Sequence, residues 1–490
     1  MTTHHESRPP LGTAVMHGIT WMFLASLVAK SMGVVTLVVT GMLLSKQDFA
    51  LYAVAIAWGE ILGYLKCGGL QRILIQRGRS FDRLFPNILA ISGSINLFWF
   101  VLLIAAAPFI AEAYRTPEIT TLIFIIALSI PVTTISGLLE AKISIDLEFH
   151  VLSTKNIYAA LVRNCGIIIL ALLEFGPMSF AIPLVLMSLF ETFYLHRKAG
   201  VACRPRWPRM RIVKPLARQS AWIMFGMLAV ALAVNGDYMV IGILENAETL
   251  GIYFFGYQLT LAVFTMLTRG MWTVLTPSFA SINLNRQRQE DAFLRALEAS
   301  ALIIFFTGFV MAAVAEPVVH AIWSGKWDHA IPVIQILGIT ALHRVVMPLT
   351  RSLLEARGNW RFVATIAWMD ALGLIASAAI GATLGGLLSI AIAVGIYNVI
   401  LALVYIGVAW ASTEHSVRNI LFAVFSPYMI AGLAFLSSWG VGLSIPTDAH
   451  QTFEAVLTGC VYVTVFALLA WLLKRKLVND SFARLRQLTE

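Results

Sequence analysis

Charge is scarce in this sequence of 490 residues, because Asp, Glu, Lys and Arg together make up 12% of it. Soluble globular chains carry about 25% charged residues. Hydrophobic residues make up 59% of the chain and recur in blocks of roughly 20 along its whole length, each long enough to cross a hydrocarbon layer of ~30 Å. The composition therefore excludes an ordinary soluble domain and predicts an all-α, polytopic membrane protein.

Cysteine is also scarce, with only Cys67, Cys165, Cys203 and Cys460. No two of them stand at C-x-x-C spacing, so neither a zinc site nor a disulfide framework is indicated. The sequence has no phosphate-binding P-loop, no metal-ligand cluster and no nucleophile paired with a base at a catalytic spacing. We therefore predict no catalytic residue, no metal site and no organic cofactor, and we expect that the protein is not an enzyme.

The apolar blocks predict about fourteen transmembrane helices, which cover residues 15–40, 49–70, 85–108, 119–140, 156–173, 178–196, 220–244, 250–273, 295–315, 332–353, 362–382, 386–410, 420–441 and 454–473. With the N-terminus in the cytoplasm, 28 of the 35 Lys and Arg residues fall in cytoplasmic segments and only three in outer loops. Cytoplasmic loops carry this excess of cations. The bias supports the helix count and predicts a multi-pass protein of a bacterial inner membrane, with both termini cytoplasmic. It also accounts for the net charge of +9 without nucleic acid as a partner.

An internal repeat divides the predicted helices into two groups of six. Gly137–Lys142, at the end of the fourth helix, matches Ser352–Arg357 at the end of the tenth. The turns at Leu44–Tyr52 and Leu244–Tyr253 also correspond, and each holds acidic residues placed to cap the helix that follows. Parallel repeats of this kind form substrate sites between them near the membrane midplane. The predicted parts are a cytoplasmic tail (1–14), an N-lobe (15–196), a basic cytoplasmic linker (197–219), a C-lobe (220–410), two further helices (411–473) and a cytoplasmic tail (474–490).

Four of the cations inside the predicted helices are candidate site residues, because a charge within the hydrocarbon costs at least ~2.5–3.5 kcal/mol. Lys30, Arg163 and Arg344 lie in mid-helix, and Arg269 lies nearer a cytoplasmic end. Such residues either line a cavity, where they would offset the desolvation of a crossing phosphate group, or form structural ion pairs within one half. We take them as candidate substrate-binding residues.

Four acids in the predicted helices are candidates of the opposite charge, namely Glu60, Asp237, Asp370 and Glu191. A buried carboxylate can hold H⁺ or Na⁺ and so couple transport to an ion gradient. It can equally neutralise one of the buried cations. The four are therefore candidates for either ion coupling or ion pairing.

Two further acids, Glu140 and Glu355, end their helices, where the helix dipole disfavours a negative charge. Lys142 and Arg357 follow closely enough in the sequence to compensate. Glu140 and Glu355 are candidates for closing a cytoplasmic gate, with simple anchoring of the loops as the alternative.

Three segments resemble a known family, namely Leu43–Ala53, Leu70–Arg77 and Ala107–Ala111. They are similar to the Wzx-type polysaccharide flippases, which translocate O-antigen and exopolysaccharide precursors. The superfamily also includes the lipid II flippases and the multidrug and toxin extrusion (MATE) transporters. Ala50 departs from the family, which usually has Gly there.

The resemblance implies a MATE-like fold of two six-helix halves with two extra C-terminal helices. It also implies alternating access through a cationic central cavity and transfer of undecaprenyl-pyrophosphate-linked oligosaccharides to the outer leaflet, often coupled to ions. The expected partners are the lipid-linked oligosaccharide, membrane lipids and the polysaccharide polymerase or export machinery.

Other functions fit less well. An ion-coupled exporter of small amphiphiles needs only twelve helices and fewer buried cations. A membrane-bound polymerase or ligase needs a substantial outer loop, whereas the predicted outer loops are short. A scaffold has no use for charges buried at such a cost.

Overall fold

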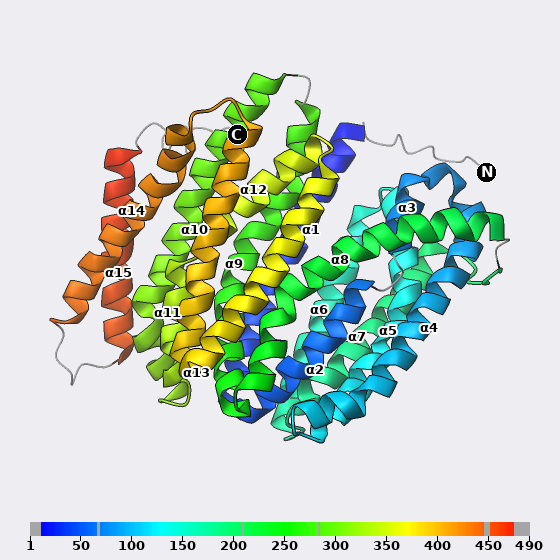
Figure 1. Ribbon diagram of the computed structural model, residues 1–490, viewed down its shortest axis with the longest axis horizontal. Helices are drawn as coiled ribbons and strands as arrows, with labels where there is room; N and C mark the ends of the chain where they lie inside the picture. Colours follow the sequence, from blue (N-terminus) through cyan, green and yellow to red (C-terminus); the bar gives the residue numbers. More distant parts are fainter. Residues whose placement is uncertain (1–10, 66–68, 208–209, 283–284, 445–450, 475–490) are drawn as a thin grey trace, which may run out of the picture. The chain divides into compact units, whose positions relative to one another are not determined.

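The computed structural model describes residues 11–65, 69–207, 210–282, 285–444 and 451–474. Most of the predicted N-terminal tail and nearly all of the C-terminal tail lie outside these ranges. Every regular element in the described part is helical (Figure 1). The helices are α1 (Leu11–Leu43), α2 (Lys46–Leu65), α3 (Leu70–Gln76), α4 (Phe81–Ala113), α5 (Glu118–Ile145), α6 (Phe149–Leu172), α7 (Met178–Ala199), α8 (Met210–Leu244), α9 (Ala247–Ser281), α10 (Arg286–Trp323), α11 (Ile331–Ile339), α12 (His343–Ala356), α13 (Trp360–Ser412), α14 (Val417–Gly442) and α15 (Gln451–Leu473), with short 3₁₀ turns at Gly78–Ser80 and Asp328–Ala330.

The predicted membrane spans are present in the described residues. Twelve helices are long and apolar enough to cross a membrane, and α11 with α12 forms a thirteenth span that is bent by 44°. Since α13 is interrupted at Gly385 and Gly386, whose φ angles are 112° and 83°, it contains two spans rather than one. Glycine tolerates such angles without strain. Counted in this way there are fourteen spans, one for each predicted segment, and the predicted fold class is confirmed.

The chain folds into two compact units, residues 1–235 and 236–490, which divide inside α8. The sequence predicted a loop-like linker at 197–219 instead. That prediction was wrong for its second half, because α7 continues to Ala199 and α8 already begins at Met210. Leu216 on this early part of α8 is 2% exposed and packs in the core of the first unit, so helical packing overrides the basic, proline-containing composition.

In the first unit, the turn between α1 and α2 is capped as the sequence predicted. The Asp48 carboxylate accepts hydrogen bonds from the Ser45 backbone N–H at 2.8 Å and from its hydroxyl at 2.7 Å. The Asp48 N–H in return donates to the Ser45 hydroxyl at 3.1 Å. In the repeat of this turn the Asn246 side chain caps the helix, since it accepts a hydrogen bond from the Thr249 N–H at 2.8 Å.

A short helix, α3, was not predicted, because its seven residues are too few to give a hydropathy signal. Gly69 precedes it with a φ of 68°, and the Ile223 side chain of α8 occupies the space where a Cβ of residue 69 would lie. Leu70 and Leu74 are fully buried against α4 and α5. A turn that requires glycine therefore places the residue before α3 against Ile223 of α8.

In the second unit, α14 and α15 pack together along α10 (Figure 1). The Tyr462 hydroxyl on α15 donates to the Phe306 carbonyl of α10 at 3.1 Å. Lys474, which directly follows α15, forms an ion pair with Glu298 of α10 and lies 4.3 Å from the centroid of the Phe422 ring. The two extra helices are thus a packed part of the second unit.

Candidate functional site

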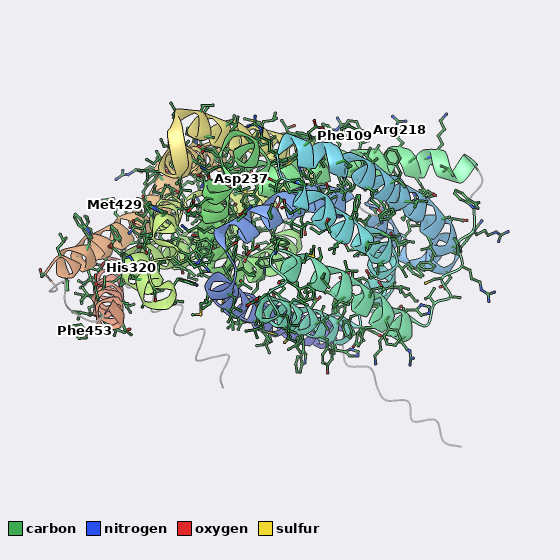
Figure 2. All side chains as sticks on the ribbon, turned by 90° about the horizontal axis from the view of Figure 1, so that it is seen from below. Phe109, Arg218, Asp237, His320, Met429 and Phe453 are labelled. Carbon is green, nitrogen blue, oxygen red and sulfur yellow. The ribbon has the colours of Figure 1, made fainter. Side chains whose placement is uncertain are left out.

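A cluster of charged and phenolic side chains lies within the second unit, on α8, α9, α12 and α13. Its centre is Asp237, which is 0% exposed and lies among the helices in Figure 2. One carboxylate oxygen accepts a hydrogen bond from the Tyr253 hydroxyl at 3.0 Å, and the other accepts from the Tyr238 N–H at 2.9 Å. Both tyrosines are also almost fully buried. Asp237 is thus held by two donors and has no cation in direct contact with it among the described residues.

Arg344 lies where the bent span breaks, at the second residue of α12. Its guanidinium stands 5.2 Å from the centroid of the Phe264 ring on α9 and is hydrogen-bonded to the Tyr257 hydroxyl. The preceding residue, His343, has a buried Nδ1 with no hydrogen-bond partner. The sequence predicted an unbroken helix over 332–353, so the break at Arg344 is a correction. Broken spans of this kind are typical of substrate and ion sites in transporters.

Asp370 completes the cluster from α13. The Tyr397 hydroxyl, on the second half of α13, donates to its carboxylate at 3.1 Å and to its backbone carbonyl at 3.0 Å. Arg344 and Arg351 both lie within electrostatic reach of this carboxylate. Arg351, however, also pairs with Glu355 at 3.0 Å. The structure thus brings three of the sequence candidates together, namely Asp237, Asp370 and Arg344.

Among the described side chains, the cluster has two carboxylates, Asp237 and Asp370, and one guanidinium without an acidic partner of its own, Arg344, since Arg351 is also paired with Glu355. When both carboxylates are ionised, the balance of charge among these groups is negative. Low-dielectric surroundings strengthen such interactions and make uncompensated charge costly. The arrangement therefore favours binding of a small cation or a proton.

A second group lies in the first unit, where Arg163 of α6 reaches α2. Its Nη2 is 3.5 Å from the Tyr52 hydroxyl, and its Nε is buried without a hydrogen-bond partner. Glu60 of α2 is within electrostatic reach of the same hydroxyl. A buried guanidinium N–H without an acceptor is uncommon in folded proteins, so Arg163 retains capacity to bind an anionic ligand.

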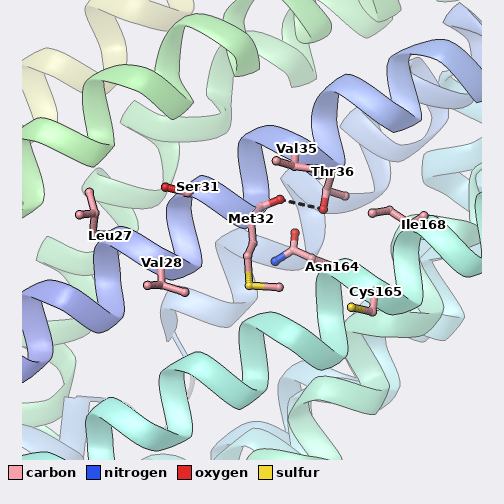
Figure 3. A pocket seen from close by; sticks show the side chains of 9 residues that line it. All are labelled: Leu27, Val28, Ser31, Met32, Val35, Thr36, Asn164, Cys165 and Ile168. Carbon is pink, nitrogen blue, oxygen red and sulfur yellow. Dashed lines mark hydrogen bonds between the residues drawn. The ribbon is translucent and has the colours of Figure 1, made fainter.

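Lys30 lies on α1 and is partly exposed. The cavity between α1 and α6 has a volume of about 390 Å³ and is drawn in Figure 3. Its walls are mostly aliphatic, with Ser31, Thr36 and Asn164 as the polar exceptions. Neither Lys30 nor Arg163 is among the residues that line it, so this space is distinct from the predicted cation-lined cavity.

The remaining basic candidate is Arg269. Its backbone lies in α9, and its side chain lies outside the described residues.

Glu140 and Glu191 both form ion pairs with Lys155, a residue that the sequence analysis placed outside the predicted helices. Lys155 lies in the second turn of α6 and is 6% exposed, and its ammonium lies 3.7 Å from Glu140 and 3.4 Å from Glu191. Glu191 is therefore an ion-pair partner. Lys155 was missed because the predicted helix began at residue 156, whereas α6 begins at Phe149.

The helix end at Glu355 is compensated differently from the prediction. Glu355 pairs with Arg351 and not with Arg357. Arg357 instead donates to Gln289 at 2.9 Å and to Glu290 at 3.0 Å, and also to the Ser412 carbonyl. In the first unit Lys142 pairs with Asp146 at 3.1 Å and not with Glu140. The two helix ends do carry ion pairs, as predicted, but Lys142 pairs with Asp146 and Arg357 with Glu290, and neither pairs with the acid that ends its helix.

Within the described residues, no group of three or more His, Cys, Asp or Glu side chains could hold a metal ion. The described residues form a multi-span membrane protein with a bent span and buried polar clusters. A family model described as polysaccharide biosynthesis protein matches residues 41–332. The chain belongs to that family.

Relatives with curated names match most of the chain. It is 23% identical over 414 residues to the teichuronic acid biosynthesis protein TuaB of Bacillus subtilis, covering 82% of each chain. It is 22% identical to the lipopolysaccharide biosynthesis protein WzxC of Escherichia coli, covering 87% of each. It is 23% identical to the succinoglycan biosynthesis transport protein ExoT of Rhizobium meliloti, covering 96% of each.

Solved structures share the fold. The lipid II flippase MurJ in an inward closed conformation superposes with a TM-score of 0.74 at 13% identity, covering 93% of this chain and 99% of MurJ. An outward-facing MATE multidrug transporter gives a TM-score of 0.54 at 14% identity, covering 83% and 99%. The expected resemblance to the Wzx-type family is confirmed, and the expected MATE-like fold is shared with these solved structures.

Proposed function

We propose that this protein flips undecaprenyl-pyrophosphate-linked oligosaccharide repeat units from the cytoplasmic to the periplasmic leaflet, for the synthesis of a surface polysaccharide. The observation that carries the proposal is near full-length similarity to proteins named for the biosynthesis or transport of three different polysaccharides. The fold shared with a lipid II flippase supports it. The protein acts in the inner membrane with both termini in the cytoplasm, beside the polymerase and export machinery that consume its product.

In this proposal, buried arginine and lysine side chains bind the pyrophosphate group of the substrate. Arg163 in the first unit has a buried, unpartnered Nε, and Arg344 in the second unit lies at a broken span beside His343. An arginine fork matches phosphate geometry, and its charge offsets the desolvation of the pyrophosphate within the membrane. Lys30 and Arg269 are assigned the same role on the position of their backbones in α1 and α9.

The proposed ion-coupling site is the cluster around Asp237 and Asp370 in the second unit. Asp237 and Asp370, with Tyr253 and Tyr397 as donors, form a site that takes up H⁺ or Na⁺. Occupation by a cation removes the excess negative charge, so the ion gradient biases the cluster between two charge states. Glu60 has the corresponding role beside Arg163, while Glu140, Glu191 and Glu355 act through their ion pairs as gate residues.

Substitution of the buried cations tests the proposal in the native strain. Arg163→Ala and Arg344→Ala should insert normally and should reduce polymer output at least tenfold, because each removes a phosphate contact worth ~1.5–3 kcal/mol. Arg418→Ala is the matched control, since Arg418 is exposed at the start of α14, and its output should stay normal. Normal output from both buried-site variants would reject the cationic path.

The alternative is an ion-coupled exporter of small amphiphiles, which the MATE transporters with the same fold bring into consideration. In that case deletion of the gene would leave polymer output unchanged and would raise sensitivity to amphiphilic drugs.

A further inference from the structure

The connection from α7 to α8 carries an unbalanced positive charge. Between Glu191 and Asp237 the sequence contains eight Lys and Arg residues and no Asp or Glu. Other cations near helix ends have acidic partners, as Lys142 has Asp146 and Arg286 has Glu290. The structure describes the side chains of six of the eight, and all six are exposed, namely Arg197, Lys198, Arg204, Arg206, Lys214 and Arg218.

Two exposed tryptophans accompany these cations. Trp207 is 79% exposed, and Trp222, on a helix long and apolar enough to span a membrane, is 73% exposed. Tryptophan is enriched at the boundary between membrane and water, where its ring sits at the level of the headgroups. Arg197 also lies beside an exposed aromatic ring, with its guanidinium 4.9 Å from the centroid of the Phe193 ring.

The segment is held in place although its cations face outward. The Arg206 N–H donates to the Pro86 carbonyl of α4 at 3.0 Å. Val201 and Cys203 pack against the core of the first unit, and Leu216 is part of that core. Arg218 lies on the outward side of α8 in Figure 2. The backbone contacts therefore fix a surface of cations and tryptophans, which need not be ordered anew when a ligand binds.

We propose that this surface, the α7–α8 basic surface (Arg197, Lys198, Arg204, Arg206, Trp207, Lys214, Arg218 and Trp222), binds the headgroups of anionic phospholipids in the cytoplasmic leaflet. Clusters of four to eight cations immediately next to a membrane span attract anionic lipid. Several exposed cations in a segment that itself contains no Asp or Glu give charge complementarity to a phosphate-rich surface. The two tryptophans match the apolar edge of that surface.

This binding would hold α7 and the start of α8 at the membrane surface. The inference rests on the proposed function only for the orientation of the segment, since the basic surface must face the cytoplasm. Lipid binding itself does not depend on whether the protein flips an oligosaccharide.

The test measures binding of single lipids to the full-length protein in neutral detergent. Energy transfer from the tryptophans to dansyl-phosphatidylglycerol gives an apparent Kd, and dansyl-phosphatidylcholine is the neutral probe. In R204Q/R206Q/R218Q the Kd for the anionic probe should rise about tenfold or more, since each cation at an anionic surface contributes up to about fivefold. The Kd for the neutral probe should not change, and 0.5 M NaCl should weaken binding of the anionic probe to the wild type.

The matched control is R288Q/R361Q/R418Q, which removes three exposed cations from the second unit and should leave both Kd values within about twofold of wild type. An unchanged Kd for the anionic probe in R204Q/R206Q/R218Q would overturn the proposal and would leave the surface to an acidic soluble partner. An equal loss in the control variant would also overturn it, because the binding would then follow net charge alone. Neither result bears on flipping, which is measured separately.

Discussion

The hydrogen bond from the Tyr253 hydroxyl to the Asp237 carboxylate offers a test of whether Asp237 is ionised. The test is the loss in free energy of unfolding when this bond is removed. Tyr253→Phe removes one donor from a fully buried carboxylate without creating a cavity. A hydrogen bond to a charged acceptor contributes about 1.5–3 kcal/mol, against about 0.5–1.5 kcal/mol for a neutral one. If Asp237 is ionised, Tyr253→Phe should therefore cost about 2 kcal/mol.

The chain offers a matched control for this substitution. Tyr462 is also 0% exposed, and its hydroxyl donates at a similar distance, 3.1 Å, to a neutral acceptor, the Phe306 carbonyl. Tyr462→Phe should cost about 1 kcal/mol. Domains of 150–250 residues lose about 2–4 °C in Tm per kcal/mol, so the two variants should differ by a few degrees in detergent.

A double-mutant cycle makes the comparison sharper. In an Asp237→Asn background the acceptor is neutral, and Tyr253→Phe should then cost no more than Tyr462→Phe does in the wild type. Equal losses for the two tyrosine variants in the wild-type background would refute an ionised Asp237. The excess negative charge, and with it the argument for bound Na⁺, would then fail, because a neutral Asp237 already holds a proton.

Two further predictions concern stability. Arg357→Ala removes three hydrogen bonds and leaves Gln289 and Glu290 partly unsatisfied, so it should reduce the free energy of unfolding by about 2–3 kcal/mol. The control Arg286→Ala, at a side chain that is 64% exposed, should reduce it by under about 1 kcal/mol. Equal Tm values for the two variants would contradict a stabilising role for the hydrogen bonds of Arg357. Gly386→Ala forces a Cβ into a φ of 83° and should cost about 1–3 kcal/mol, while Gly440→Ala, in a helix with open space around its Cα, should be neutral or slightly stabilising in the same assay.

Hydropathy and charge bias were enough to predict the membrane spans, because crossing ~30 Å of hydrocarbon requires about 20 apolar residues whatever the tertiary fold. The same reasoning could not find α3, whose position depends on Gly69 and on its contact with Ile223 of α8. It also placed the start of α6 seven residues late, and so it missed Lys155. Hydropathy locates the hydrocarbon-spanning part of a helix, whereas the helix itself continues into polar sequence.

The sequence was enough to identify the charged candidate residues, but not the residues with which they interact. The cost of burying a charge identified Asp237, Asp370 and Arg344 from the sequence, and the structure brings them into one cluster. The tyrosines that donate to the two acids, Tyr253 and Tyr397, could not be identified, because an uncharged phenol in an apolar helix is unremarkable until its neighbours are known. The bend before Arg344 was also not predicted, although Gly338, near the end of α11, and Pro348, within α12, stand on either side of it.

The most direct test of the proposed function is transfer of the lipid-linked sugar itself. The full-length protein would be reconstituted into vesicles that contain a pyrophosphate-linked oligosaccharide lipid from the native strain, and exposure of the sugar in each leaflet would be followed with a membrane-impermeant enzyme or lectin. The account predicts protein-dependent transfer that is reduced at least tenfold in Arg344→Ala and that responds to an ion gradient in the wild type but not in Asp237→Asn. The absence of any transfer by correctly inserted wild-type protein would contradict it.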